Sequence, residues 1–264
     1  MSDPFPPVSS PPVATQPGPA LPGEDAAFFL DLDGTLLEIA PRPDEVVVPK
    51  ELPDLLVALR RRCGGAVAVV TGRPLAVARG YAGVPELPIG AEHGAVLDPP
   101  LPGAPPLPVP PPEWRRAADE FAAARPGTLT EHKTHGLVVH FRLRPEAEAE
   151  ALALLEGLIR DDSKGFHIVP AHAAAELRPV GADKGGAVHR LMAVEPFRGR
   201  RPVFIGDDIT DEDGMAACAA YGGHGLRVAD DFAGRPALVR AWLARVAAQG
   251  VEPRIGVGEA AAPA

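Results

Sequence analysis

The stretch Asp31-Leu32-Asp33-Gly34-Thr35 decides the fold of this 264-residue chain. It follows the apolar run 26–30, Ala-Ala-Phe-Phe-Leu, which is typical of a buried strand in a parallel sheet. A glycine at position 34 allows a sharp bend, so both carboxylates can turn toward one point beyond the carboxyl end of the strand. Open α/β sheets bind their ligands at that end.

Two carboxylates held close together repel each other unless a cation binds between them. The stretch therefore indicates a Mg²⁺ site that includes a nucleophilic or acid/base aspartate. Aspartate, glycine and threonine are also ordinary turn residues, so a helix N-cap or an Asx-turn is the alternative. The remainder of the chain has to decide between these two interpretations.

Composition narrows the class of protein. An apolar fraction of 46% supplies a core, and a net charge of −9 argues against binding to nucleic acid or to an anionic membrane. Two cysteines give no disulfide framework, no apolar run is long enough to cross a bilayer, and we see no secretory signal. We therefore expect a cytoplasmic protein, and we expect it to be a monomer.

Prolines mark the borders of the folded units. The stretches 1–23 and 99–112 are rich in proline, of which the chain has 33. The first stretch predicts a disordered tail, and residues 250–264 predict a second one. Residues 99–112 lie inside the chain, so they are typical of a semi-rigid connector between two folded units.

A strand–helix–strand unit follows the opening stretch. Leucines at 52, 55, 56 and 59 are spaced for a helix, and the run 66–70, Ala-Val-Ala-Val-Val, predicts a second strand. Because the strands of such a unit are parallel, Thr71 should lie at the same sheet edge as Asp31. Its hydroxyl and the N–H groups of Gly72 and Arg73, ahead of a short predicted helix over 75–81, suit an anion.

The middle of the chain has a different pattern. Its apolar spacing predicts helices over 113–124 and 145–160, and strands over 128–134, 137–143, 166–172 and 173–178. The order αββ-αββ predicts a small antiparallel sheet with helices on one face. We expect this α+β unit to be a lid inserted into the main domain.

The main domain then resumes. Lys184 stands at the start of a helix predicted over 187–193, and the run 202–205 predicts a third buried strand. An acidic run at 206–213, which includes Asp207 and Asp208, follows that strand directly. A solvated acidic loop is the alternative, but two aspartates after a buried strand and a glycine favour a site. A strand over 225–228 and a helix over 235–248 complete the prediction.

Four signals now stand in order: Asp-x-Asp-Gly-Thr after one strand, Thr71 after a second, a lone Lys184, and Gly-Asp-Asp after a third. Together they resemble the haloacid-dehalogenase superfamily of phosphohydrolases. The stretches 131–133 (Glu-His-Lys), 176–179 (Glu-Leu-Arg-Pro), 183–185 and 206–212 are similar, more narrowly, to the family of trehalose-6-phosphate phosphatases. The resemblance covers residues 26 to 248.

This resemblance implies an α/β fold, with a Rossmann-like parallel-sheet core and an inserted, smaller α+β cap. About 40 residues separate Asp31 from Thr71, whereas about 110 separate Thr71 from Lys184. The cap should therefore enter at the second of the two insertion points, as in a C2-type cap. We expect the core to span 24–105 and 180–249, and the cap to span 106–179.

The resemblance also implies roles for the core residues. Asp31 would attack the phosphorus to form an aspartyl-phosphate, and Asp33 would serve as general acid and then as general base. Mg²⁺ would be held by Asp31, the backbone carbonyl of Asp33, and Asp207, with Asp208 as a further ligand or as support. Thr71 and Lys184 would bind the phosphoryl oxygens.

The substrate side is expected on the cap. By resemblance, Glu131, Lys133 and Glu176 would contact the glucose units, and we expect Arg142 to face the same gap. Gly72 and Arg73 are expected to bind substrate from the core. An ion-pair ladder on the surface of an antiparallel sheet is the alternative for the cap residues.

Three functions remain open from the sequence. The first is a trehalose-6-phosphate phosphatase that works beside a trehalose-phosphate synthase. The second is a Mg²⁺ phosphatase for another sugar phosphate, such as sucrose or mannosylglycerate phosphate. The third is a non-catalytic carbohydrate-binding or regulatory domain. Such a domain would be expected to lose a catalytic group, yet Asp31, Asp33, Lys184 and Asp207 are all present.

Overall fold

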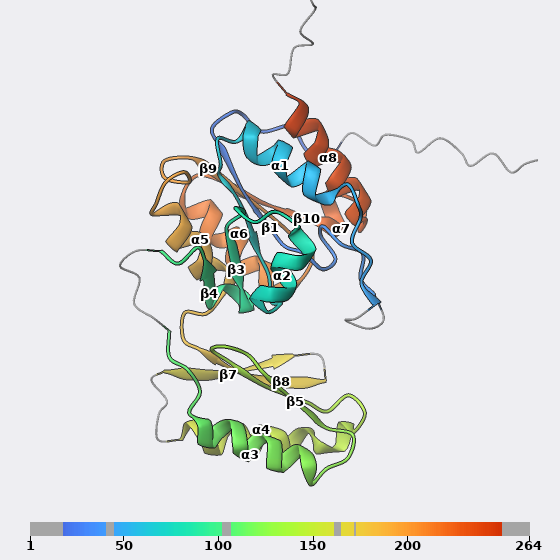
Figure 1. Cartoon of the computed structure of the whole chain (residues 1–264), viewed down its shortest axis with the longest axis vertical. Helices are drawn as coiled ribbons and strands as arrows, with labels where there is room; N and C mark the ends of the chain where they lie inside the picture. Colours follow the sequence, from blue (N-terminus) through green and yellow to red (C-terminus); the bar gives the residue numbers. More distant parts are fainter. Residues whose placement is uncertain (1–17, 41–44, 102–106, 161–164, 172, 250–264) are drawn as a thin grey trace, which may run out of the picture.

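The computed structural model describes residues 18–40, 45–101, 107–160, 165–171 and 173–249 (Figure 1). Two sheets organise these residues: a six-stranded sheet in the order β10-β9-β1-β2-β3-β4, and a four-stranded sheet in the order β5-β6-β8-β7. Most of the predicted N-terminal tail, the whole C-terminal tail and the middle of the proline-rich connector lie outside the described residues. Within the described part of the chain, no helix is long and apolar enough to cross a membrane.

In the larger sheet, the strand order changes direction at the central strand β1. Its strands are β1 (Ala26–Leu30), β2 (Val67–Val70), β3 (Ile89–Ala91), β4 (Val96–Asp98), β9 (Arg201–Gly206) and β10 (His224–Arg227). All neighbours pair in parallel except β3 and β4. Because β1 lies between β2 and β9, the chain leaves β1 on one side and returns on the other. Such a switch point is where open α/β sheets form their binding crevice.

Helices cover both faces of the larger sheet (Figure 1). The first face carries α1 (Leu52–Arg62), α2 (Leu75–Ala82), α7 (Val228–Asp231) and α8 (Pro236–Ala248), and the second carries α5 (Lys184–Met192) and α6 (Glu212–Ala220). Successive side chains of β1 alternate between these two cores: Phe28 packs in the first and Phe29 in the second. Because β1 is buried on both faces, all of its residues are apolar.

The smaller sheet is antiparallel and covered on one face only. It consists of β5 (Leu129–His132), β6 (Leu137–His140), β7 (Phe166–Ala171) and β8 (Ala174–Pro179). Helices α3 (Pro112–Ala123) and α4 (Glu148–Ile159) pack against the face that points away from the larger sheet (Figure 1). We call these helices and strands the smaller unit. Its open face looks toward the carboxyl ends of β1, β2 and β9.

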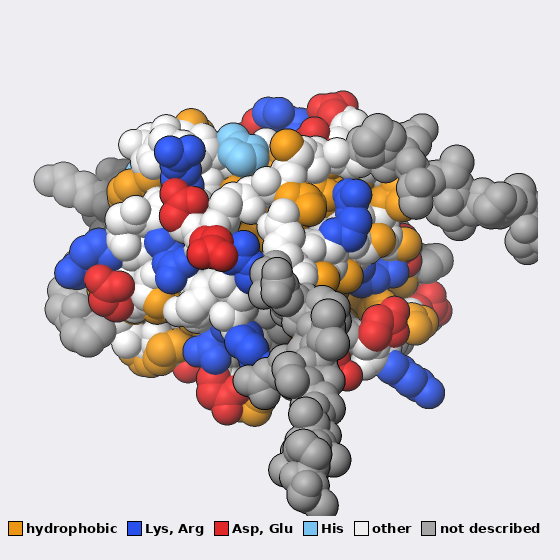
Figure 2. Space-filling view, turned by 90° about the horizontal axis from the view of Figure 1, so that it is seen from above, with side chains coloured by type: hydrophobic (Ala, Val, Ile, Leu, Met, Phe, Trp, Pro, Cys, Tyr) orange, Lys and Arg blue, Asp and Glu red, His pale blue; other side chains and the backbone are white. Residues whose placement is uncertain are grey.

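The end of the molecule opposite the smaller unit has a mixed, charged surface (Figure 2). This end of the larger unit carries basic side chains mixed with acidic ones and with scattered apolar groups (Figure 2). At the amino ends of β1 and β9, which lie opposite the cavity, Arg201 pairs with Asp25 at 3.4 Å. An exposed pair of this kind contributes about 0–1 kcal/mol.

The predicted α/β class is confirmed, and the differences are local. The strands β5 and β6 end at His132 and His140, earlier than predicted, so Lys133 and Arg142 lie just beyond their strands. The predicted helix over 145–160 begins with a 3₁₀ turn, η3 (Pro145–Ala147), before α4. Four of the helices and strands in the described residues were not predicted: β3, β4, α6 and α7. The two strands have three residues each, too few to show a periodic pattern.

We expect Trp242→Ala in α8 to lower the free energy of unfolding by about 3–5 kcal/mol, since a large buried aromatic leaves a cavity. The indole is 2% exposed, packs edge-on against Phe28 and Phe232, and donates from Nε1 to the carbonyl of Pro19 at 2.8 Å. Urea unfolding measures the loss. The control Val57→Ala, on the exposed side of α1, should change stability by less than about 0.5 kcal/mol. Equal losses for the two variants would contradict this account of the core.

Candidate active site

A cavity of about 820 Å³ lies between the carboxyl ends of the larger sheet and the smaller unit. Its volume falls within the range of roughly 300–1,000 Å³ that is usual for small-molecule sites. Both units contribute to its wall. The lining residues are Asp31, Asp33, Ile39, Ala40, Thr71, Gly72, Arg73, Pro74, Val77, His93, Glu131, Lys133, Arg142, Lys184, Asp207, Asp208 and Thr210.

Lys184 forms the buried centre of this cavity. It opens α5, after Asp183 has capped the helix by accepting from the N–H of Gly186. Its Nζ donates to Oδ1 of Asp31 at 2.8 Å and to Oδ1 of Asp211 at 2.6 Å. Burial opposes the charge of the amine, but the two carboxylates outweigh it and raise the pKa of Lys184. The amine is therefore a permanent cation at the carboxyl ends of β1 and β9.

Asp31 itself stands in a crowded acidic environment. Burial raises the pKa of Asp31 to about 7, and the negative charges of Asp211 and Asp207 act in the same direction while Lys184 opposes them. Burial also raises the pKa of Asp207 to about 6, with Asp211 and Asp208 adding to the effect. Such carboxylates are held together at a cost that a bound cation would remove.

The acidic run after β9 is folded tightly. Asp208 caps the 3₁₀ turn η4 (Ile209–Asp211) by accepting from the N–H of Ile209 at 2.6 Å. Asp211 is fully buried and its Oδ2 accepts from the N–H groups of Asp207 and Asp208, both at 3.0 Å. This capping arrangement turns the run into the start of α6 and leaves the side chain of Asp207 exposed and directed at the cavity.

Three carboxylates meet closely enough to hold a metal ion. Asp31, Asp207 and Asp211 each offer one oxygen within 4.8 Å of the others. An all-oxygen set of this kind suits Mg²⁺. The chain also leaves room for the approach of Asp207, because a Cβ at Gly34 would lie 2.0 Å from its Oδ2, and Gly34 has a left-handed φ of +75°. The residues present therefore fit a divalent cation.

Asp33 is held by an arginine of the neighbouring strand end. Arg73 donates from Nε and from a terminal nitrogen to the two oxygens of Asp33, at 2.8 and 2.7 Å. Thr71 follows β2 directly, is 1% exposed, and accepts through Oγ1 from the N–H of Arg73 at 3.2 Å. This places a hydroxyl and a guanidinium beside the carboxylates, as the parallel arrangement predicts.

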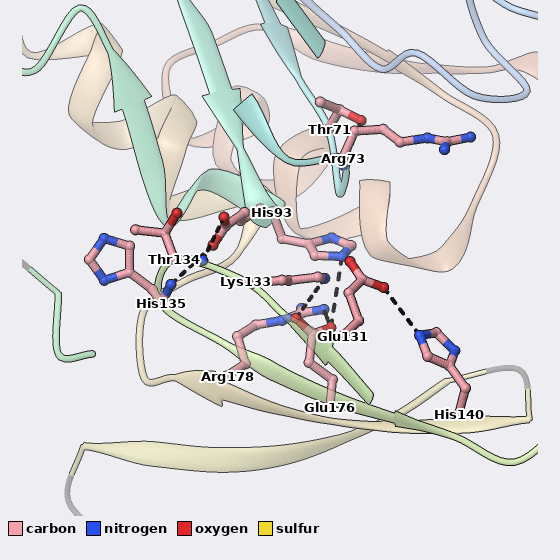
Figure 3. Close-up of polar contacts among 11 residues, drawn as sticks. Thr71, Arg73, His93, Glu131, Lys133, Thr134, His135, His140, Glu176 and Arg178 are labelled. Atoms are coloured by element: carbon pink, nitrogen blue, oxygen red, sulfur yellow. Dashed lines mark hydrogen bonds and ion pairs between the residues drawn. The ribbon is translucent and has the colours of Figure 1, made fainter. Parts of the chain in front are cut away.

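On the smaller unit, a second charged cluster faces the cavity (Figure 3). The carboxylate of Glu176 on β8 accepts from Lys133 Nζ and from Arg178, both at 2.8 Å. Burial alone would raise the pKa of Glu176, but the charges of Lys133 and Arg178 outweigh it and lower the pKa to about 2. Glu131 on β5 pairs instead with His140 on β6, at 3.1 Å. The cluster carries both donors and acceptors, as hydroxyl recognition requires.

His93 reaches this cluster from the larger unit (Figure 3). Its Nε2 lies 4.0 Å from the nearer oxygen of Glu176, and its buried Nδ1 has no hydrogen-bond partner among the described residues. Burial lowers the pKa of His93 well below its usual value, and Arg178 and Lys133 lower it further. The ring is therefore neutral at the point where the two units meet.

The structure brings most of the predicted site residues to one place. Of the residues it describes, the cavity wall includes every predicted site residue except Glu176, which lies behind Lys133 as its partner. Asp208 lines the cavity but stands outside the group of three carboxylates, because its own oxygen caps η4. The sequence reasoning missed Asp211. The signal for it was its place three residues after Asp208, the spacing of a capping box.

Comparison with known proteins gives a consistent result. The family model described as trehalose-phosphatase matches residues 29–221. A probable trehalose-phosphate phosphatase of Sinorhizobium fredii is 37% identical over 205 residues, which cover 76% of this chain and 77% of that protein. The trehalose-6-phosphate phosphatase of Escherichia coli is 33% identical over the same shares of the two chains.

Solved structures agree on the fold. The crystal structure of a trehalose-6-phosphate phosphatase related protein matches with a TM-score of 0.62 and 20% identity, over 85% of this chain and 98% of that one. The alignment of the family model spans Asp31, Thr71, Lys184 and Asp207 together. The chain is therefore a phosphatase and belongs to the trehalose-phosphatase family.

Proposed function

We propose that this phosphatase hydrolyses trehalose 6-phosphate to trehalose and phosphate. The observation that carries the proposal is the cavity itself. One end holds Asp31 and the buried amine of Lys184, 2.8 Å apart, and the other end is formed by Glu131, Lys133 and Arg142 of the smaller unit. A phosphate group suits the first end, and the hydroxyls of a sugar suit the second.

The proposed reaction begins at Asp31. A carboxylate oxygen of Asp31 attacks the phosphorus, the bond from phosphorus to the sugar oxygen breaks, and Asp33 gives its proton to that oxygen. Asp33 then takes a proton from water, whose oxygen attacks the phosphorus and releases Asp31. The hydroxyl of Thr71 and the amine of Lys184 bind the phosphoryl oxygens throughout and offset their charge.

Mg²⁺ is the cofactor that the acidic residues fit best. We propose that Asp31, the backbone carbonyl of Asp33, and Asp207 would hold it, with Asp208 close by. When bound, the ion would supply positive charge to the phosphoryl oxygens. Asp211 acts behind these residues, because it anchors both Lys184 and the backbone of Asp207.

We further propose that the smaller unit is a C2-type cap over 106–179, and that residues 24–105 and 180–249 form the catalytic core. The sugar would lie between them, where Glu131, Lys133 and Glu176 contact the glucose units and Gly72, Arg73 and Arg142 complete the binding surface. A monomeric state, a cytoplasmic location and coupling to a trehalose-phosphate synthase stay predictions.

A panel of sugar phosphates tests the substrate. We expect trehalose 6-phosphate to give a kcat/KM at least about 10-fold above those of sucrose 6-phosphate and mannosylglycerate phosphate, because a site that hydrogen-bonds a given sugar discriminates against others. Released phosphate is the measurement. A stronger preference for one of the other compounds would assign the enzyme to that substrate instead.

The nucleophile is tested by Asp31→Asn. We expect kcat to fall at least about 10³-fold, since an amide cannot form the aspartyl-phosphate intermediate. The loss of one member of a catalytic group typically removes most of the rate enhancement of the whole group. The midpoint of thermal unfolding should move by no more than about 4 °C, which corresponds to about 1 kcal/mol in a chain of this size. The control Asp25→Asn, just before β1, should keep full activity. Substantial turnover by the Asp31→Asn enzyme would rule out the assignment.

Metal binding is tested by thermal unfolding in place of activity. In the protein without a bound cation, the native pKa values of about 7 for Asp31 and about 6 for Asp207 exceed the usual value of about 3.9 in an unfolded chain. The native state then binds protons more tightly, so its stability falls as the pH rises from about 4 to about 7. Mg²⁺ competes with those protons.

We therefore expect Mg²⁺ to raise the unfolding temperature more at about pH 8 than at about pH 5. At about 100 times its Kd, an ion that binds only the native state stabilises it by about 2.7 kcal/mol. Asp207→Asn should reduce the shift. Calorimetry with and without a chelator makes the comparison, and an equal shift at both pH values would contradict the proposed ligands.

A further inference from the structure

One loop of the larger unit has a backbone that its residues do not favour. Glu92 and His93, which follow β3 in the 3₁₀ turn η2 (Glu92–Gly94), have φ values of +50° and +57°. Left-handed backbone at a residue other than glycine costs on the order of 1–3 kcal/mol and persists only where the surroundings require it. Two such residues in succession point to a role for the position of their side chains.

The side chain of Glu92 binds the smaller unit. It is 4% exposed, and its two carboxylate oxygens accept from the N–H of Thr134 at 2.8 Å and from the N–H of His135 at 3.1 Å. These two N–H groups belong to the turn between β5 and β6, where Figure 3 labels Thr134 and His135. Hydrogen bonds to a charged acceptor are roughly twice as strong as neutral ones.

The same turn is held from its other side. Arg115 of α3 donates to the carbonyls of Lys133 at 2.8 Å and of Thr134 at 3.2 Å. The larger unit thus binds the N–H groups of the turn, and the smaller unit binds its carbonyls. Lys133 immediately precedes the N–H groups that Glu92 holds, and its side chain lines the cavity. The backbone of Lys133 is therefore fixed relative to the larger unit.

The backbone of the loop binds the phosphate end of the cavity. The N–H of Glu92 donates to the carbonyl of Arg73 at 3.0 Å, and the N–H of His93 donates to the carbonyl of Thr71 at 2.8 Å. Hydrogen bonds of the Glu92–His93 loop therefore join Thr71 and Arg73 to Thr134, the residue after Lys133.

We propose that Glu92 is a positioning residue that docks the β5–β6 turn on the larger unit. Its carboxylate thereby sets the distance between the phosphate end of the cavity and Lys133. This inference rests on the proposed function, since only a substrate long enough to reach both ends needs that distance. A phosphate ester with a small leaving group needs only the residues of the larger unit.

The kinetic test compares two substrates. We expect Glu92→Ala to lower kcat/KM for trehalose 6-phosphate at least about 10-fold, mainly through KM, and to change kcat/KM for p-nitrophenyl phosphate less than about twofold. Glu92→Gln keeps one acceptor oxygen and should fall between Glu92→Ala and the unchanged protein. The control Glu86→Ala, in the exposed part of the loop before β3, should leave both substrates unaffected.

Amide hydrogen exchange supplies a readout that does not depend on activity. In Glu92→Ala without substrate, the amides of Thr134 and His135 should exchange at least about 10-fold faster, while the amides of β8 keep their rates. Unchanged exchange at the turn, or an equal loss of activity on both substrates, would overturn the proposal. If the unchanged enzyme does not act on trehalose 6-phosphate, the proposed function fails, and the exchange rates still decide the role of Glu92.

Discussion

The ion pairs of Lys184 are the interaction on which the rest of the structure depends. A buried amine has to be paired, and here two carboxylates from different strand ends meet it, Asp31 after β1 and Asp211 after β9. Removing both carboxylates would leave a buried charge without compensation, which typically costs about 3–5 kcal/mol, whereas either one alone still pairs with the amine. The same arrangement gathers more negative charge than one amine can neutralise, and three of its carboxylates lie close enough to fit a cation.

The sequence predicted the parallel core well because its physical signal is strong. Strands buried on both faces, such as β1 and β2, appear as unbroken apolar runs, and a polar residue after each run marks the shared edge of the sheet. The signal is weak where an element is short or mixed. The strands β3 and β4 are three residues long, and α6 begins inside an acidic run whose capping role appears only with its backbone geometry.

The sequence predicts those residues of the site that come directly after a buried strand. That rule placed Asp31, Thr71 and Asp207 at one edge of the sheet, where they line the same cavity, but it did not predict the contacts among side chains. Nothing in the sequence shows that Glu176 would bind Lys133 from 43 residues away, or that Arg73 would hold Asp33. Such pairings depend on the register of β5, β6 and β8 and on the docking of the two units, which are set by tertiary packing.

The return of the chain from the smaller unit has a mechanical consequence. Strand β8, which carries Glu176, ends at Pro179, and α5 begins at Lys184, so four residues join them; the outward connection from β4 to α3 has thirteen. A tilt of β8 would therefore be transmitted to the helix that bears the amine over only four residues. The position of Glu176 and the position of the Lys184 amine are therefore coupled through a short stretch of backbone.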